Sequence, residues 1–166
     1  MISYTKDEIE RFIEAGKKIE EKSNSNAMEK LLSICHKIKI FEGLSKDELK
    51  SIIYDAKFKK FNQKEFIIKE GHSSQEIYYL IDGKCEIIKN STKIATLEKE
   101  QTFGDNGLLN QKSKRIVSVV VSSQNAIVLS FKIDHENREF GAQALLVVYQ
   151  NIMHQLSSKL QEIKFA

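Results

Sequence analysis

The chain of 166 residues contains no proline and no tryptophan, and it has only two cysteines. Without tryptophan, and with lysines spread along the chain instead of gathered in a stripe, a nucleic-acid-binding surface is not expected. The formal net charge of +3 is also too small to argue for such a partner. Cys35 and Cys85 lie in apolar segments with no second pair, so we expect buried free thiols in a reducing compartment.

Long hydrophobic runs are also missing. The longest, near Ile116–Val121 and Ala144–Tyr149, are far too short to span a bilayer. The N-terminus has no apolar stretch after a basic start, as a signal peptide would have. We therefore expect a cytoplasmic protein with no membrane partner.

The residues that usually carry metal or covalent chemistry are scattered. The four histidines, His36, His72, His135 and His154, lie far apart and show no paired spacing of metal ligands. A cupin-like metal enzyme would need such ligands clustered on two strands. No serine has the context of a nucleophile elbow, and no cysteine and histidine pair suggests covalent catalysis. The sequence thus predicts no metal, no cofactor, no catalytic residues and no enzyme.

What the sequence does contain begins with helical patterns. Residues 1–26 predict an amphipathic helix, begun by a capping box at Thr5 and Glu8, and a polar linker. A second helix is expected from Ala27 to about Ile38 with Asn26 as its cap, and a third is capped by Ser45 and carries Leu49, Ile52 and Ile53.

At the other end of the chain, Asn137 could cap a helix that runs to about Lys164. Its broad apolar stripe fits either packing on the N-terminal helices or a homodimer seam, and the pattern alone leaves both open.

Between these helices the hydrophobic period shortens towards two. Strands are expected near Phe58–Phe61, Phe66–Ile68, Ile77–Ile81, Cys85–Ile88, Lys93–Leu97, Val117–Ser122 and Ala126–Ile133. Asp82 and Gly83 are typical of a β-hairpin turn, and Asn90 with Ser91 predicts a further turn. Short strands with glycine turns and no proline indicate an antiparallel barrel or sandwich, so the fold class is mainly β with flanking helices.

One segment, FGDNGLLNQKSKRIVSVVV from Phe103 to Val121, is hard to explain by folding alone. Gly104 and Gly107 allow a ligand to approach the main chain, and successive N–H groups in such a turn form an anion site. Leu108 and Leu109 predict the start of a short helix, whose positive end would point the same way. The apolar run from Ile116 to Val121 predicts a buried strand.

Two charged side chains complete this segment. Arg115 offers a bidentate charged fork that matches phosphate oxygens. Asp105 would repel phosphate but can accept hydrogen bonds from sugar hydroxyls. Anion donors beside a hydroxyl acceptor describe a sugar phosphate. The plainer alternative is a loop whose acid and base form an ion pair.

The order of these features resembles the cyclic nucleotide-binding domain family. Ile67–Ile88 is similar to the glycine-punctuated strand pair of that family, and Ile40–Ser45 is similar to the phrase that leads into its barrel. Phe103–Val117 resembles its phosphate-binding cassette: FGE, a variable and a small residue, Leu, a short loop, then Arg and two small residues.

The resemblance covers roughly Ile38 to Leu160. It implies an antiparallel β-barrel of the jelly-roll type, or double-stranded β-helix, within residues 27–166, with N-terminal helices and a long C-terminal helix. It also implies a regulatory module that senses cAMP or cGMP. A homodimer through the C-terminal helix and an effector protein, not identified by the sequence, are the further expected partners.

The family pattern assigns roles to individual residues. Arg115 would pair with the cyclic phosphate, the N–H groups of Gly107 and Leu108 would share it, and Asp105 would accept the ribose hydroxyl. The candidate ligand-binding residues are Gly104, Asp105, Gly107, Leu108, Lys114, Arg115 and Ile116.

Three features depart from the pattern or leave it open. Asp105 is one methylene shorter than the glutamate of the family, the branched Ile116 and Val117 replace small residues, and Lys114 is a second base beside Arg115. These departures leave open an alternative, a degenerate fold that binds no nucleotide and acts in dimerisation or protein interaction.

Overall fold

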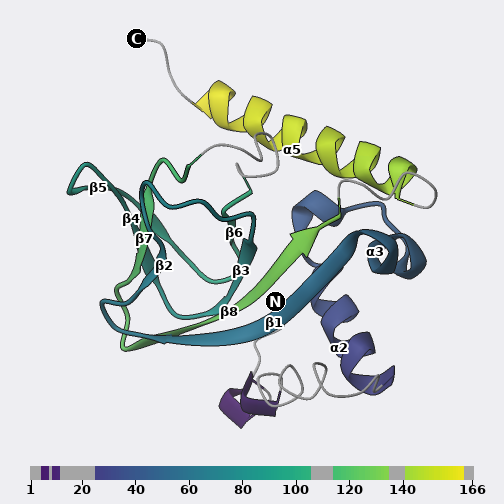
Figure 1. Ribbon diagram of the computed structural model, residues 1–166, viewed down its shortest axis with the longest axis horizontal. Coiled ribbons are helices and arrows are strands. Elements are labelled where there is room, and N and C mark those ends of the chain that lie inside the picture. The colour runs from purple at the N-terminus through teal and green to yellow at the C-terminus, as the bar shows by residue number, and fades with distance from the viewer. Residues whose placement is uncertain (1–4, 8, 12–24, 106–113, 135–140, 163–166) are drawn as a thin grey trace. The chain divides into compact units, whose positions relative to one another are not determined.

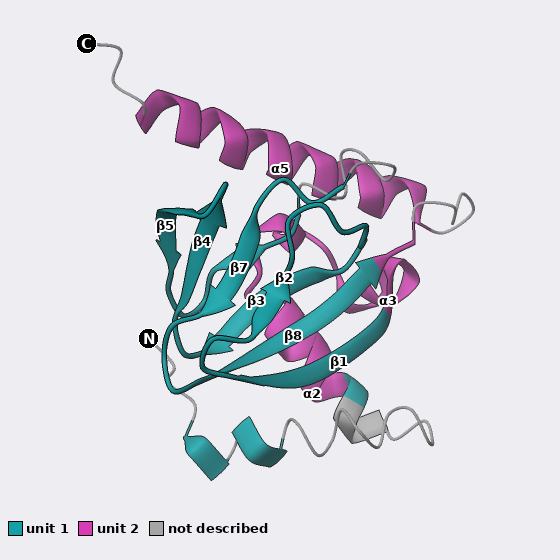
Figure 2. Cartoon of the chain, turned by 60° about the vertical axis from the view of Figure 1, so that its left-hand side comes forward, with its two compact units in different colours: residues 1–28, 55–132 teal, residues 29–54, 133–166 magenta. Residues whose placement is uncertain are grey.

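The computed structural model describes residues 5–7, 9–11, 25–105, 114–134 and 141–162 (Figure 1). These residues fall into two compact units (Figure 2). Unit 1 comprises residues 1–28 and 55–132, and unit 2 comprises residues 29–54 and 133–166. The strands lie almost entirely in unit 1, whereas unit 2 is mainly helical.

In the described residues, the strands form two four-stranded sheets. One sheet has the order β1-β8-β3-β6 and the other β2-β7-β4-β5. The pairs with a determined register are antiparallel. The strands are β1 (Ile53–Asn62), β2 (Phe66–Ile68), β3 (Ile77–Asp82), β4 (Cys85–Lys89), β5 (Thr92–Leu97), β6 (Thr102–Phe103), β7 (Ser118–Val121) and β8 (Asn125–Ile133). This arrangement confirms the predicted jelly-roll class.

Side chains from both sheets share one hydrophobic core. Its members include Ile68 of β2, Leu80 of β3, Phe103 of β6, Val119 of β7 and Val128 of β8. Cys85 also lies in this core, and Cys35 is buried in unit 2, both as free thiols as predicted. Burial raises the pKa of Cys85 to about 11 and that of Cys35 to about 12.

The two predicted turns have different outcomes. Asn90 and Ser91, with φ of 47° and 63°, join the paired strands β4 and β5 in a hairpin, as expected. Asp82 ends β3 and Gly83 forms a bend before β4, but the hairpin prediction is wrong, because β3 and β4 belong to different sheets. Gly83 (φ 97°) is required there, since a Cβ atom would lie 2.5 Å from the carbonyl oxygen of Asn125.

Unit 2 contains the end of α2 (Ser25–Cys35), the 3₁₀ helix η1 (Lys39–Phe41), α3 (Lys46–Ile52) and α5 (Ala142–Glu162). Ser45 caps α3 as predicted, with its Oγ accepting from the N–H of Glu48 at 3.2 Å. Asn151 of α5 donates to the carbonyl oxygens of Ile40 and Glu42 at 3.0 and 2.9 Å. The buried face of α5 carries Ala144, Val148 and Ile152.

Some predicted boundaries are wrong by a few residues. Ile53 was expected in the third helix, but its backbone is extended (φ −91°, ψ 130°) and begins β1. The second helix starts at Ser25, so Asn26 lies within it and is not its cap, and it ends at Cys35. Thr102–Phe103 forms a short strand that the periodicity did not indicate.

Other predicted features cannot be compared. Glu8, most of the first helix, the proposed cap Asn137 and the end of the last helix at Lys164 lie outside the described residues. Residues 6–7 and 9–11 are helical. No helix in the described part of the chain is long and apolar enough to cross a membrane.

Candidate functional site

The two ends of the glycine and arginine segment are attached to different sheets. Gly104 and Asp105 follow β6, which pairs with β3 through Tyr78 and Phe103. Arg115 precedes β7, which pairs with β2 and β4 in the other sheet. A contact between the side chain of Arg115 and the residues that follow β6 therefore connects the two sheets.

The backbone of Arg115 is fixed by the turn that follows β2. The N–H of Arg115 donates to the carbonyl oxygen of His72 at 2.8 Å, and the N–H of Gly71 donates to the carbonyl oxygen of Arg115 at 2.8 Å. These two hydrogen bonds continue the β2–β7 pairing past the strand ends. The side chain of Arg115 thus starts from a rigid position.

The guanidinium group of Arg115 is buried against two carbonyl groups. Nη1 donates to the carbonyl oxygen of Gly104 at 2.8 Å, and Nη2 donates to that of Glu76. The residue is only 9% exposed. Its Nε atom is buried and has no hydrogen-bond partner among the described residues. A buried charged donor without a partner is uncommon and requires an explanation.

Gly104 fits this contact because it has no side chain. Its φ of 80° lies in the left-handed region, which residues with a Cβ atom seldom adopt. A Cβ atom there would lie 3.0 Å from the carbonyl oxygen of Glu76 and 3.3 Å from Nη1 of Arg115. The glycine predicted from the motif is therefore needed to let the arginine approach the main chain.

Burial and the neighbouring groups shift the pKa of Arg115 in opposite directions. Burial lowers the pKa of the Arg115 guanidinium, whereas Tyr78, Glu76 and Asp105 raise it. The net shift is downward, but an arginine side chain stays protonated in proteins. Asp105 is thus close enough for its charge to be felt by the guanidinium, as the sequence suggested.

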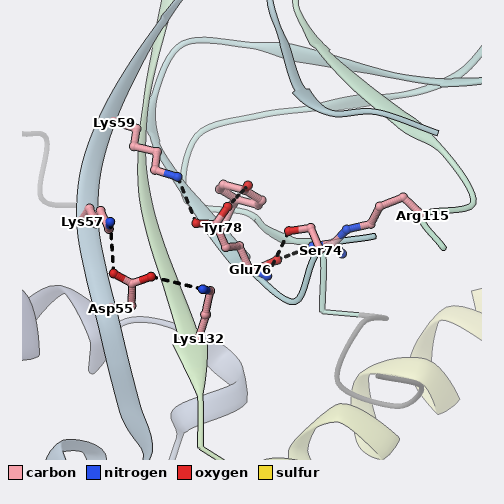
Figure 3. Close-up of polar contacts among 8 residues, drawn as sticks. All are labelled: Asp55, Lys57, Lys59, Ser74, Glu76, Tyr78, Arg115 and Lys132. Carbon is pink, nitrogen blue, oxygen red and sulfur yellow. Dashed lines mark hydrogen bonds and ion pairs between the residues drawn. The ribbon is translucent and has the colours of Figure 1, made fainter. Parts of the chain in front are cut away.

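Glu76 links Arg115 to further polar side chains (Figure 3). Its carboxylate accepts from Tyr78 Oη at 2.6 Å and from Lys59 Nζ at 3.0 Å. Burial by itself would raise the pKa of Glu76, but the hydrogen bonds from Tyr78 and Lys59 outweigh burial and place this pKa below its ordinary value. Burial, followed by the bond to Glu76, raises the pKa of Tyr78.

The ring of Tyr78 also contributes to the wall of the site. It is stacked on Phe103, with ring centroids 5.2 Å apart and an angle of 16° between the planes. Tyr78 is 4% exposed and belongs to the hydrophobic core. The stack holds β3 and the start of the candidate cassette together.

The residues beside Arg115 point elsewhere. Lys114 is exposed, so the buried base of the pair is Arg115. The expectation that Ile116 begins a buried strand is wrong: its side chain is 58% exposed, and β7 starts at Ser118. Lys89 Nζ donates to the carbonyl oxygen of Ile116 at 2.8 Å, and this bond holds the chain in a bend before the strand.

The structure therefore brings together Gly104, Asp105 and Arg115, and it adds Glu76, Tyr78 and Lys59, which the sequence analysis did not select. No sequence signal connects Glu76 with Arg115, which is 39 positions further along the chain. Gly107 and Leu108, together with the short helix expected at Leu108 and Leu109, lie outside the described residues. Among the residues described, no group of His, Cys, Asp or Glu could hold a metal ion.

Fold and site together define a small antiparallel jelly roll with a buried arginine behind a glycine turn. Residues 58–138 match the family model of the cyclic nucleotide-binding domain. This part of the chain therefore belongs to the cyclic nucleotide-binding domain family, in agreement with the resemblance noted in the sequence.

Two curated relatives are cGMP-dependent protein kinases. The one from Plasmodium berghei (strain Anka) is 30% identical over 93 residues, which cover 56% of this chain and 11% of the relative. The one from Toxoplasma gondii is 32% identical over 91 residues, covering 55% and 9% respectively. The chain thus spans about a tenth of the length of these relatives.

Solved structures show the same fold at low sequence identity. The sensor domain of the transcriptional regulator DNR from Pseudomonas aeruginosa has a TM-score of 0.63 and 16% identity, covering 80% of this chain and 96% of that one. The regulatory domain of Toxoplasma gondii PKA with cAMP has a TM-score of 0.62 and 14% identity, covering 81% and 51%.

A third structure has the fold with a different ligand. The regulatory subunit of a cAMP-independent protein kinase A from Trypanosoma cruzi, bound to guanosine, has a TM-score of 0.58 and 16% identity. The match covers 72% of this chain and 43% of that one.

Proposed function

We propose that this chain is a regulatory module that binds a cyclic nucleotide, cAMP or cGMP, at Arg115. The observation that carries the proposal is the buried guanidinium, whose Nε atom has no partner among the described residues. An anionic phosphate oxygen would supply the missing acceptor and would compensate the charge. The family membership of residues 58–138 supports the same ligand class.

In this proposal each candidate residue has one role. Arg115 binds the cyclic phosphate, and the N–H groups of Gly107 and Leu108 donate to the same group. Asp105 accepts a hydrogen bond from the ribose hydroxyl. Because Ile116 is 58% exposed, its branched side chain is not buried in the core behind the arginine. The protein then acts as a binding module and not as an enzyme.

Isothermal titration calorimetry with cAMP and cGMP tests the proposal. Saturable binding is expected for the wild type, and Arg115→Ala should weaken it by about tenfold to a hundredfold, the value of a hydrogen bond to a charged group. Lys114→Ala is the matched control, because Lys114 is the neighbouring base but is exposed. Binding that survives Arg115→Ala and is lost in Lys114→Ala would contradict the assignment.

The alternative is a degenerate module that binds no cyclic nucleotide. Its support is that both Nη atoms of Arg115 already donate to carbonyl groups, as expected of an arginine that only organises a loop. The regulatory subunit from Trypanosoma cruzi, which has the same fold, is bound to guanosine, so guanosine is a further ligand to test. Guanosine is therefore titrated in parallel, and saturable binding of guanosine alone would replace the cyclic nucleotide proposal.

We further propose that ligand binding changes the contacts of α5. A ligand can shift a helix only if its affinity differs between the two helix positions. Leu146, Met153 and Leu160 of α5 are 50%, 64% and 62% exposed and follow one another at intervals of seven residues. This spacing is typical of a helix pair, so we propose a homodimer through α5. An effector protein and a cytoplasmic location are parts of the same proposal.

A further inference from the structure

The carbonyl oxygen of Glu76 needs to be held in place if it is to orient Arg115. Nη2 of Arg115 donates to this oxygen, but Glu76 precedes β3, which begins at Ile77. The ladder between β3 and β8 also starts at Ile77, opposite Phe131. Strand pairing therefore does not include Glu76, whose carbonyl oxygen accepts the hydrogen bond from Arg115.

Side-chain contacts supply the missing restraint (Figure 3). The carboxylate of Glu76 is held by Lys59 of β1 at 3.0 Å and by Tyr78 of β3 at 2.6 Å. The N–H of Glu76 donates to Ser74 Oγ at 3.3 Å. These contacts come from three places in unit 1, so they fix both the side chain and the peptide of Glu76.

The ion pair is sheltered from solvent. The side chain of Glu76 is 20% exposed and that of Lys59 is 32% exposed, which limits screening by water and salt. On the same strand, Lys57 pairs with Asp55 at 3.1 Å, and that carboxylate also pairs with Lys132. Lys57 thus offers a neighbouring ion pair that does not involve Glu76.

We propose that Glu76 is a positioning residue for Arg115, which acts through its own carbonyl oxygen and is anchored by Lys59 and Tyr78. The network holds the guanidinium in an orientation in which Nε can donate to an acceptor atom of a ligand. The part of this inference that concerns nucleotide affinity rests on the function proposed above. The orientation of the arginine can be measured without any nucleotide.

The first measurement is nitrogen-15 NMR of the arginine side chains in the full chain without nucleotide. In the wild type, the Nη atoms of Arg115 should be distinct because rotation about the Nε–Cζ bond is hindered. Glu76→Ala should speed this rotation at least severalfold, and Lys59→Met should have a smaller effect in the same direction. Lys57→Met should leave the rotation at the wild-type rate.

A conservative variant separates positioning from general stability. Glu76→Gln keeps an acceptor oxygen for one of the two anchors, so it should restore part of the hindrance lost in Glu76→Ala. Lys59→Met leaves the Glu76 backbone untouched and keeps the test decisive if Glu76→Ala does not fold. Unchanged Arg115 rotation in Lys59→Met, and in Glu76→Ala where that variant folds, would overturn the proposal.

The second measurement is calorimetry with cAMP and cGMP on the same variants. Glu76→Ala is expected to weaken binding about tenfold, equal to the loss of one well-positioned hydrogen bond. Full wild-type affinity in Glu76→Ala would overturn the role in binding. If the wild type binds neither nucleotide, the proposed function fails, while the NMR measurement still decides whether Glu76 positions Arg115.

Discussion

At the scale of single residues, the contact between Gly104 and Arg115 shows how a backbone conformation and a charged side chain depend on each other. The left-handed φ of Gly104 turns its carbonyl oxygen towards Nη1 of Arg115 at 2.8 Å. The absence of a Cβ atom leaves the room that the guanidinium and the Glu76 carbonyl occupy. A substitution at this glycine therefore tests both effects.

Gly104→Ala should destabilise the protein by more than Gly71→Ala. Both glycines have left-handed backbones, with φ of 80° and 84°, so each variant should lose about 1–2 kcal/mol from backbone strain. At Gly71 nothing lies within 4 Å of a new Cβ atom, whereas at Gly104 three atoms lie within 3.3 Å. Urea unfolding gives the two free energies, and equal losses would contradict the tight packing at Gly104.

The carboxylate of Glu76 makes stability depend on pH in a defined direction. Its pKa lies below the ordinary value of 4.5, so the folded state favours the ionised form. The contribution is fully present above pH 4.5 and is lost as the pH falls through the pKa of the folded state. The stability difference between wild type and Glu76→Gln should therefore shrink below that pH.

Unfolding by urea at a series of pH values measures this difference. Glu98→Gln is the control, because Glu98 pairs with Lys84 at 3.7 Å and its side chain is 54% exposed. Exposed ion pairs contribute little, so this variant should match the wild type throughout. A Glu76→Gln difference that stays constant from neutral to acid pH would contradict the assignment.

Sequence reasoning selected Gly104, Asp105 and Arg115 because turn-forming and charged residues leave a local signature. It could not find Glu76 or Lys59, since their contact with the site depends on pairing between distant strands. For the same reason it misplaced Ile116. Apolar residues in a row indicate a buried strand, but a hydrogen bond from Lys89 to the Ile116 carbonyl keeps the chain bent until Ser118.

At the scale of helices and strands, local chemistry predicted the existence of most elements but not all of their connections. Asp82 and Gly83 have the composition of a hairpin turn, and the chain bends at Gly83. The pairing of the two flanking strands depends on the sheets as a whole: β3 pairs with β6 and β8, and β4 pairs with β5 and β7. Ile53 lies at the extended start of β1 and not in the predicted third helix, because isoleucine is also favoured in strands.

One amide side chain adds polar contacts to the packing of α5 within unit 2. Asn151 donates to the carbonyl oxygens of Ile40 and Glu42, at the 3₁₀ helix η1. Asn151→Ala removes both donors and should cost about 1–3 kcal/mol, since Ile40 is fully buried. Thermal or urea unfolding measures the loss, and the exposed neighbour Gln150→Ala should be nearly neutral.

At the scale of the whole molecule, α5 presents two different apolar faces. Ala144, Val148 and Ile152 are buried within unit 2, whereas Leu146, Met153 and Leu160 are exposed. The broad stripe that left packing and dimerisation open in the sequence thus divides into an internal face and a face available to a partner. The packing of α5 within unit 2 is observed, whereas dimerisation through its exposed face is a proposal.

Met153→Glu tests the proposed dimer. If a second copy covers the exposed face, a charge at its centre should convert dimers to monomers in sedimentation equilibrium at micromolar concentration, because burying an unpaired carboxylate is costly. Ser158→Glu places the same charge on an exposed polar position that does not adjoin Leu146, Met153 or Leu160 on the helix surface, and it should leave the association unchanged. A monomeric wild type at high concentration would remove the dimer. It would leave the nucleotide site untouched, because the residues that hold Arg115 all belong to unit 1.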